Sequence, residues 1–387
     1  MTERSEVIGT VPRYGAGSLP DVLPSALAAL GVPGPDPLGL RERLAGVRRI
    51  AVVLVDGLGY HLLPLAAPVA PTIADVLAGR LGTVLELTSP FPSTTPTSLV
   101  SLGTGVPPGQ HGQLGFFLAI PGTGRVLNPL TWRDEPDPAR WQPVPTLFER
   151  AAGTGVQVSV ASRPEYAGSG LTVAAYRGSR YRDAANPDEL ATQVLAGLVE
   201  APALSYGYHP TLDSTGHVHG VDSPQWRAAA AEVDALLARL VDGLPRDGAL
   251  LVTADHGQLD VPADRRFDLD ADPRLAAGIE VVAGEPRVRY LHTRPGAAPD
   301  VLDAWRAVLG DAAWVASREE AIGTGWYGAV STGHAARLGD VVAVCRQRYA
   351  VLATAHEPPT IAKLVAFHGS TTPQEMVIPL VIVRGDR

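Results

Sequence analysis

The fold is decided by the stretch Arg48-Arg-Ile-Ala-Val-Val-Leu-Val-Asp56. A continuous run of β-branched and other apolar residues predicts a strand that is covered on both faces, as strands of a parallel sheet are. The run ends on the acid Asp56, and Gly57 and Gly59 follow closely. Ligands of open α/β sheets gather at the carboxyl ends of such strands. We therefore expect Asp56 in a functional site, although it could equally cap a helix over 57–65.

Helical and strand-like patterns alternate after this run. The predicted helices cover 146–152, 187–199 and the amphipathic stretch 224–244, and the predicted strands cover 156–160, 203–208 and a buried run that starts at Gly248. Such alternation is typical of strands joined by crossover helices. The sequence therefore predicts an α/β fold with a doubly wound, mostly parallel sheet and helices on both faces.

Three regions differ in composition. Residues 1–47 are rich in proline and form a predicted N-terminal arm with one short helix over 21–30. Residues 261–335 carry many Asp, Arg and Pro residues, and we expect them to form an inserted cap with a strand over 287–291 and a helix over 299–309. The catalytic core is then predicted to comprise 48–260 and 336–387.

Composition excludes several classes of protein. A chain of 387 residues with 45% hydrophobic residues can bury a large core, and a net charge of −8 disfavours a nucleic-acid polymer as partner. The single cysteine, Cys345, excludes an intramolecular disulfide and cysteine-based zinc sites, and we expect it to be buried on a strand. The segment Met1–Ile8 lacks the features of a secretory signal, and no run of about 18 apolar residues predicts a membrane span. These patterns favour a cytoplasmic location, and they leave the oligomeric state open.

A cluster of hydroxyl groups lies in the stretch Phe91-Pro-Ser-Thr-Thr-Pro-Thr-Ser-Leu-Val-Ser-Leu-Gly-Thr-Gly105. A proline-broken segment leads here into a short apolar run, which is how a loop places a side chain at the start of a helix. A threonine alcohol is protonated near neutral pH. It therefore needs an adjacent base or a metal ion to act as a nucleophile.

Acids and histidines recur in pairs that could bind a metal ion. Asp213 and His217 lie four residues apart, so they can share one side of a turn or helix start, and His219 could serve as a supporting or substrate group. The pair Asp255-His256 follows the buried strand that starts at Gly248. His368 comes late in the chain. Oxygen and nitrogen ligands without a thiolate suit zinc, manganese or iron.

In their joint order these motifs resemble the alkaline phosphatase superfamily, and within it the bacterial nucleotide pyrophosphatase/phosphodiesterase branch. The resemblance covers 48–260 and 339–383, and it implies two divalent metal ions, with Zn²⁺ expected first and Mn²⁺ or Fe as alternatives. It also implies a metal-dependent hydrolase of phosphodiester or pyrophosphate bonds in a small nucleotide-type phosphate ester. The reaction would pass through a covalent phospho-threonine intermediate. The implied ligands are Asp56, Asp255 and His256 for one ion and Asp213, His217 and His368 for the other, with Thr95 as the metal-bound nucleophile between them.

Two choices within the resemblance have competitors. The family motif counts back nine residues from Thr104-Gly105 and selects Thr95 over Thr94 and Thr97. For the last ligand, His334 and His356 compete with His368, which is favoured because Gly369 and a closing strand follow it. The pair His111-Gly112 is similar to the family's structural turn, whereas His61, His209 and His292 are expected to be ordinary histidines.

One departure concerns the substrate. Members of this branch carry an asparagine shortly after the His-Gly turn, where it contacts a phosphoryl oxygen, and the corresponding place here is Phe116. A phenylalanine cannot donate a hydrogen bond. Candidate substitutes are Gln113, Asn128, Arg163, Arg177 and Arg180, although the cluster over 177–182 could instead be a solvated loop.

This departure keeps other functions open. A phosphomonoesterase or phosphonate hydrolase would use the same two metal ions with different contacts to the substrate. A manganese-dependent mutase is a further option, whereas a sulfatase is disfavoured because its usual Cys or Ser precursor motif is absent. A non-catalytic binding protein on this fold is the alternative from another class, and the presence of every proposed ligand disfavours it.

Overall fold

Strand β1 (Arg49–Val55) lies in the middle of a seven-stranded sheet of order β2-β17-β8-β1-β7-β5-β6. The computed structural model describes residues 9–386, so the predicted absence of a leader over Met1–Ile8 and the start of the predicted arm lie outside it. The other strands of this sheet are β2 (Thr83–Thr88), β5 (Gln157–Ser162), β6 (Arg180–Asp183), β7 (Ala203–His209), β8 (Gly248–Thr253) and β17 (Val377–Arg384).

The main sheet is mostly parallel. Strand β1 pairs in parallel with β7 on one side and β8 on the other, and β5 pairs in parallel with β7 and β6. Among the described strands of this sheet, only β17 runs in the opposite direction to the others. It pairs antiparallel with both β8 and β2. The predicted α/β class and the predicted strand around 48–56 are confirmed.

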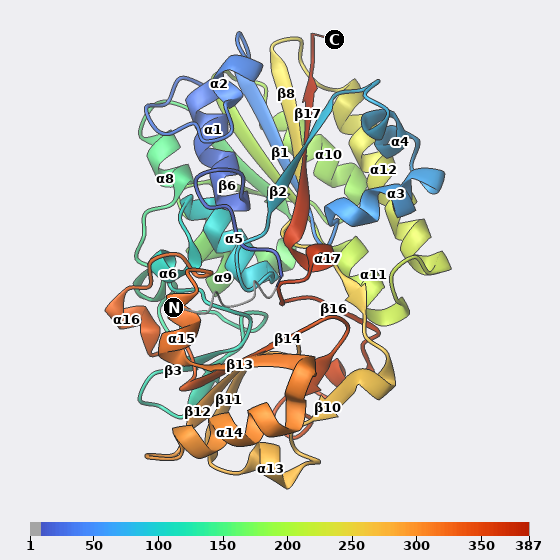
Figure 1. Ribbon diagram of the computed structural model, residues 1–387. Coiled ribbons are helices and arrows are strands. Elements are labelled where there is room, and N and C mark those ends of the chain that lie inside the picture. Colours follow the sequence, from blue (N-terminus) through green and yellow to red (C-terminus); the bar gives the residue numbers. More distant parts are fainter. Residues whose placement is uncertain (1–8, 387) are drawn as a thin grey trace, which may run out of the picture.

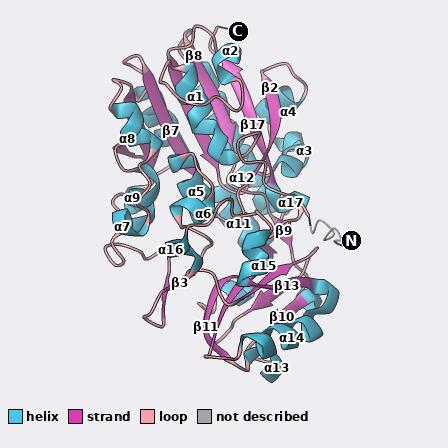
Figure 2. Cartoon of the chain, turned by 60° about the vertical axis from the view of Figure 1, so that its left-hand side comes forward, coloured by secondary structure: helices cyan, strands magenta, loops and turns pink. Residues whose placement is uncertain are grey.

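Helices cover both faces of the sheet (Figures 1 and 2). One group packs around α5, and a second group packs around the long helix α12. The first group comprises α1 (Val22–Ala29), α5 (Thr95–Thr104), α8 (Leu147–Ala152) and α9 (Gly170–Tyr176), and the second α4 (Pro71–Leu77), α10 (Pro187–Ala196), α11 (Thr211–His219) and α12 (Pro224–Asp242). The helices predicted near 21–30, 146–152, 187–199 and 224–244 are therefore present.

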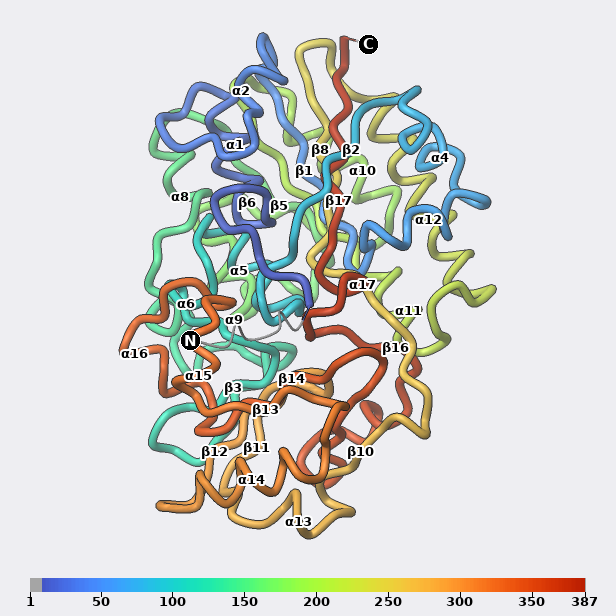
Figure 3. Tube along the Cα trace, viewed as in Figure 1, coloured from blue at the N-terminus to red at the C-terminus, as the bar shows by residue number. Residues whose placement is uncertain are grey.

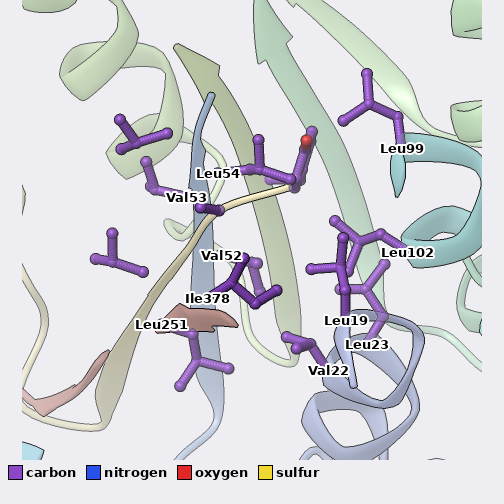
Figure 4. Close-up of a cluster of buried hydrophobic side chains, with 14 of the residues drawn as sticks. Leu19, Val22, Leu23, Val52, Val53, Leu54, Leu99, Leu102, Leu251 and Ile378 are labelled. Atoms are coloured by element: carbon purple, nitrogen blue, oxygen red, sulfur yellow. The ribbon is translucent and has the colours of Figure 1, made fainter. Parts of the chain in front are cut away.

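The main core explains why β1 is apolar along its whole length. Its residues from Ile50 to Val55 are all fully buried. Figure 4 shows Leu23 of α1 and Leu102 of α5 in the same buried cluster as Val52 of β1. The described part of the predicted arm thus packs against α5, and this packing fixes the helix that begins at Thr95.

A smaller antiparallel sheet of order β11-β12-β14-β13 lies beyond the carboxyl ends of the main strands (Figure 1). Its strands are β11 (Ile279–Glu285), β12 (Val288–Thr293), β13 (Ala313–Ser317) and β14 (Val341–Cys345), and it packs against α14 (Ala298–Leu309). Strand β14 belongs to this sheet by hydrogen bonding, although it lies beyond the cap predicted to end at 335. The division into arm, core and cap stays a prediction.

Cys345 is buried at the end of β14, as expected for an unreactive thiol, and burial raises its pKa to about 11. No helix within residues 9–386 is long and apolar enough to cross a membrane.

Candidate metal centre

Acidic residues follow three neighbouring strands of the main sheet where those strands end. Asp56 comes directly after β1, and Asp255 lies two residues beyond β8. Strand β7 leads into helix α11, which carries Asp213. The three strands are adjacent and parallel, so their carboxyl ends meet at one edge. Figure 3 shows that the last part of the chain, through β16 (Ala366–Phe367), returns to α11 at this edge, and His368 follows directly.

The first cluster contains Asp56, Asp255 and His256, whose ligand atoms all lie within 4.8 Å of one another. The Nε2 atom of His256 is 3.2 Å from Asp255 Oδ2 and 3.6 Å from Asp56 Oδ1. Both of these carboxylate oxygens are buried, and neither has a hydrogen-bond partner among the described residues. Buried carboxylate oxygens are normally paired, so these two are available to a cation.

The second cluster contains Asp213, His217 and His368, again with all ligand atoms within 4.8 Å. The Nε2 atom of His217 lies 3.2 Å from Asp213 Oδ2, and that of His368 lies 3.8 Å from Asp213 Oδ1. The four-residue spacing of Asp213 and His217 falls within one helix, where it places both side chains on the same face.

The three imidazoles of the two clusters are oriented in the same way. The Nδ1 atoms of His217, His256 and His368 lie 2.7 Å, 3.1 Å and 2.9 Å from the backbone oxygens of Ala366, Gly257 and Ser93. A carbonyl oxygen only accepts hydrogen bonds, so each Nδ1 carries a proton, and the neutral form of each ring is then the tautomer with its lone pair on Nε2. This is the usual arrangement of a metal-bound histidine, whose second nitrogen is fixed by a hydrogen bond.

Two polar side chains support the carboxylates from behind. The hydroxyl group of Tyr208 donates a hydrogen bond to Asp56 Oδ2. Gln258 Nε2 donates to Asp213 Oδ1 at 2.9 Å. Each bond occupies one oxygen of its carboxylate and leaves the other oxygen directed toward the cluster. Sequence reasoning missed both residues, because neither stands in a metal-ligand pattern.

The electrostatics of the centre indicate a surplus of negative charge. Burial and the nearby carboxylates of Asp255 and Asp213 raise the pKa of Asp56 well above its usual value. Burial also raises the pKa of Asp213, but the adjacent His217 and His368 lower it more, and the net direction is downward. Burial lowers the pKa of His368 well below its usual value, so this imidazole is neutral near pH 7.

These observations fit divalent metal ions. Three carboxylates and three imidazole Nε2 atoms are the ligand types that zinc, manganese and iron share, and two oxygens without hydrogen-bond partners face the first cluster. The two clusters are the same two ligand sets that the resemblance implied.

The hydroxyl group of Thr95 lies beside one of the metal-ligand candidates. Thr95 is the first residue of α5, and its Oγ1 lies 3.2 Å from His256 Nε2. Thr94 is the N-cap residue of α5 and is buried, as is Thr97. Asp56 does not cap the next helix, which was the alternative role. That helix begins at Tyr60, and its N-cap residue is Gly59.

The other candidate histidines lie elsewhere. His334 Nδ1 is 3.1 Å from the backbone oxygen of Gly109, and His356 forms an ion pair with Asp270. His111 is the last residue of α6 (Pro108–His111), just before Gly112, and its ring lies 2.8 Å from Ser101 Oγ, as expected for a structural histidine. His219 is exposed at the end of α11, outside both clusters.

A pocket of about 500 Å³ opens onto the metal centre. Some of the predicted substrate-binding residues line this pocket and others do not. Asn128 lines this pocket. Gln113 does not, because it is fully buried and bonds Gly115 and Trp141 instead.

The arginine candidates lie away from the pocket. Arg177 forms an ion pair with Glu149 at 3.2 Å, and Arg180 is an exposed residue of β6. Arg163 donates to Thr211 Oγ1 at 3.4 Å and does not line the pocket. Phe116 lines the pocket, together with Phe117 and Tyr166.

Comparison with known proteins gives a consistent result. A family model described as type I phosphodiesterase/nucleotide pyrophosphatase matches residues 50–373. An uncharacterized pyrophosphatase/phosphodiesterase of Schizosaccharomyces pombe is 28% identical over 214 residues, which are 52% of this chain and 43% of that protein. Ectonucleotide pyrophosphatase/phosphodiesterase 1 of Saccharomyces cerevisiae is 25% identical over 255 residues, which are 54% of this chain and 34% of that protein. The chain thus spans less than half the length of these relatives.

Solved structures share the fold. Murine ectonucleotide pyrophosphatase/phosphodiesterase 5 superposes with a TM-score of 0.67 at 19% identity, over 86% of this chain and 87% of that one. An inactive variant of the same murine protein has been solved in complex with AMP and gives a TM-score of 0.67. Phosphonoacetate hydrolase from Sinorhizobium meliloti, in complex with phosphonoacetate, gives 0.63 at 19% identity, over 86% of this chain and 89% of that one.

Proposed function

Because this chain belongs to the type I phosphodiesterase/nucleotide pyrophosphatase family, we propose that it is a metal-dependent hydrolase of phosphodiester or pyrophosphate bonds. The substrate is a small nucleotide-type phosphate ester. Thr95 is the nucleophile, and the reaction passes through a covalent phospho-threonine. Two divalent metal ions, Zn²⁺ first among the candidates, are held by Asp56, Asp255 and His256 and by the second cluster defined above.

The observation that carries this proposal is the placement of Thr95. Its hydroxyl oxygen lies 3.2 Å from Nε2 of His256, and the residue lines the same pocket as Asp56, Asp213 and His368. The hydroxyl group thus opens onto the same pocket as the candidate metal ligands. Such a group meets the requirement that a threonine nucleophile be activated by a neighbouring metal ion.

The side chains would divide the work as follows. When bound, the metal ions lower the pKa of the Thr95 hydroxyl and stabilise charge on the phosphoryl oxygens. The oxygen of Thr95 attacks phosphorus in line with the leaving group, whose bond to phosphorus breaks as the new bond forms. Water then displaces Thr95 from phosphorus and restores the hydroxyl group. The positive end of the α5 dipole faces the attacked phosphoryl group and favours its negative charge.

The smaller sheet contributes to the substrate pocket in this proposal. Glu285 and Pro286, at the end of β11, line the pocket together with residues of the main domain. We therefore propose that the predicted cap borders the substrate, while the metal ligands come from the predicted core.

A monoester or phosphonate substrate is the second candidate. Phe116 lines the pocket where the resemblance leads one to expect a hydrogen-bond donor to the phosphoryl group. A phenylalanine ring offers no such donor, so the recognition of the phosphoryl group must differ from that of typical diesterases.

A substrate panel tests the proposal. Purified protein loaded with zinc or manganese is assayed with nitrophenyl phosphate, bis-nitrophenyl phosphate, the nitrophenyl ester of thymidine monophosphate, and phosphonoacetate. We expect the diesters to be cleaved fastest, and Thr95→Ala to lose at least about 1,000-fold in turnover with its metal content intact. Thr97→Val, in the same helix, serves as the matched control and should keep activity. Equal rates for Thr95→Ala and wild type would remove Thr95 from the mechanism.

A further inference from the structure

Glu285 is a buried acid in the substrate pocket that the mechanism above does not use. It is the last residue of β11 and lines the pocket together with Thr95 and His368. Only 4% of its surface is exposed, and its Oε1 atom has no hydrogen-bond partner among the described residues. A buried carboxyl oxygen without a partner is costly, so its persistence calls for a ligand.

The backbone next to the last metal ligand holds Glu285 in place. A Cβ atom added to Gly369 would lie 2.8 Å from Glu285 Cδ and 2.9 Å from its Oε2. The carboxyl group therefore packs directly on the residue that follows His368, and only glycine leaves room for it. Strand β11 is fixed on the other side, because Gly284 and Phe117 exchange backbone hydrogen bonds of 2.7 Å and 3.2 Å.

No cation is bound to this carboxyl group within residues 9–386. The charge of Arg289 acts on Glu285, but this arginine is paired with Glu357, with its Nη2 atom 2.8 Å from Glu357 Oε2. Arg287 is likewise paired with Glu375 at 2.7 Å. The environment of Glu285 therefore favours the neutral acid over the carboxylate.

The acid–base properties agree with this geometry. The pKa of Glu285 is raised to about 8, with burial as the largest cause. The hydroxyl of Thr94, the charge of Arg289 and the backbone N–H of Phe116 lower it, and the charge of Glu375 raises it. An anionic phosphoryl group in the pocket would favour the neutral form still more, because like charges repel.

We propose that Glu285 determines specificity for the phosphoryl group by donating a hydrogen bond from its carboxyl group to a non-bridging phosphoryl oxygen. It would supply the contact that Phe116 cannot make, from the smaller sheet instead of from the turn after His111. The inference rests on the proposed function, since it needs a phosphoryl substrate at the metal centre. A neutral carboxylic acid kept as a hydrogen-bond donor by an apolar site has precedent in enzymes.

Two substitutions of Glu285 distinguish a hydrogen-bond donor from a negative charge at this position. Glu285→Gln keeps the shape and supplies an N–H donor, and we expect kcat/KM for bis-nitrophenyl phosphate within about threefold of wild type. Glu285→Leu removes the donor, and we expect a loss of about 10-fold to 100-fold. Glu280→Gln is the matched control at an exposed acid of the same strand, outside the pocket, and should be unchanged. Metal content and thermal unfolding are measured for every variant.

A binding measurement provides a readout apart from turnover. In the metal-loaded Thr95→Ala background, calorimetry with inorganic phosphate should show binding about 10-fold weaker for Glu285→Leu and nearly unchanged for Glu285→Gln. Equal phosphate affinity and equal kcat/KM for Glu285→Leu and wild type would overturn the inference. A loss in Glu285→Gln as large as in Glu285→Leu would also overturn it, since the group would then act as a charge.

The outcome can be told apart from a failure of the proposed function. If wild type cleaves none of the phosphoryl substrates, the proposed function fails, and the Glu285 inference fails with it. If wild type cleaves them and Glu285→Leu cleaves them equally well, only the inference about Glu285 is lost.

Discussion

The imidazole rings of His256 and His368 are stacked, with ring centroids 3.6 Å apart and an angle of 14° between the ring planes. One ring belongs to the first cluster and the other to the second, so this contact joins the two metal-binding groups. Two cationic rings would repel each other at this distance. The stacked geometry therefore favours a neutral His368, which agrees with the lowered pKa of this imidazole.

Replacement of His368 tests the second cluster. We expect His368→Ala to bind about one metal ion fewer per chain than wild type, because Asp213 and His217 alone offer an incomplete set of ligands. The metal content of protein purified and dialysed against zinc is measured by elemental analysis. His334→Ala is the control, since His334 belongs to neither cluster and contacts the backbone oxygen of Gly109 instead. Full metal content in His368→Ala would show that the ion is held without this side chain.

Replacement of Tyr208 tests the support of the first cluster. Tyr208→Phe removes the hydrogen bond to Asp56 Oδ2 and leaves the ring in place. We expect zinc affinity to fall by about 10-fold, as is typical when a partner of a metal ligand is lost. The affinity is measured by competition with a chromogenic chelator. Tyr206→Phe, two residues earlier on β7, removes a hydrogen bond to Tyr176 instead and should leave the affinity unchanged. Identical affinities in both variants would mean that Tyr208 does not orient Asp56.

Patterns that are local in the sequence predicted much of this structure. The apolar run before Asp56 predicted a covered strand. The prediction succeeded because β1 has neighbours on both sides and helices on both faces, so its side chains from Ile50 to Val55 are all buried. The spacing of Asp213 and His217 predicted a shared face because both lie on α11. His368 was favoured over His334 because Gly369 and a closing strand follow it, and these features point to a metal ligand only through the resemblance.

Residues that act through distant partners could not be predicted in this way. Tyr208 contacts Asp56 across 152 positions, and Gln258 contacts Asp213 across 45. Neither pair has a spacing rule, because sheet order brings the residues together. Strand β14 falls within the range 336–387 that was predicted as core, and its hydrogen bonds join it to the smaller sheet, a pairing that no local pattern in the sequence indicates. Arg177 is positively charged, as a phosphate-binding residue would be, but it pairs with Glu149.

Acidic pH should destabilise the protein partly through His209. Burial and then the charge of Arg163 lower the pKa of this imidazole from 6.5 to about 4. Between pH 6.5 and pH 4 the unfolded chain binds a proton that the folded His209 excludes, so its contribution is present above pH 6.5 and is lost as the pH falls. At pH 4.5 the loss amounts to about 2 kcal/mol.

The measurement is urea unfolding of wild type and His209→Gln at pH 7.0 and pH 4.5. Glutamine does not titrate, so the variant should lose about 2 kcal/mol less than wild type over this range. The comparison of the two proteins removes the contributions of the other histidines, which both share. An equal loss in the two proteins would show that His209 titrates alike in the folded and unfolded states.

Anomalous diffraction at the zinc absorption edge tests the central claim most directly. Crystals of the zinc-loaded protein should give two strong peaks beside the Thr95 hydroxyl. One peak should be bounded by Asp56, Asp255 and His256 and the other by Asp213, His217 and His368, the two groups whose ligand atoms already lie within 4.8 Å of one another. A single peak, or peaks bound to other side chains while these six remain unoccupied, would contradict a two-metal centre at this site.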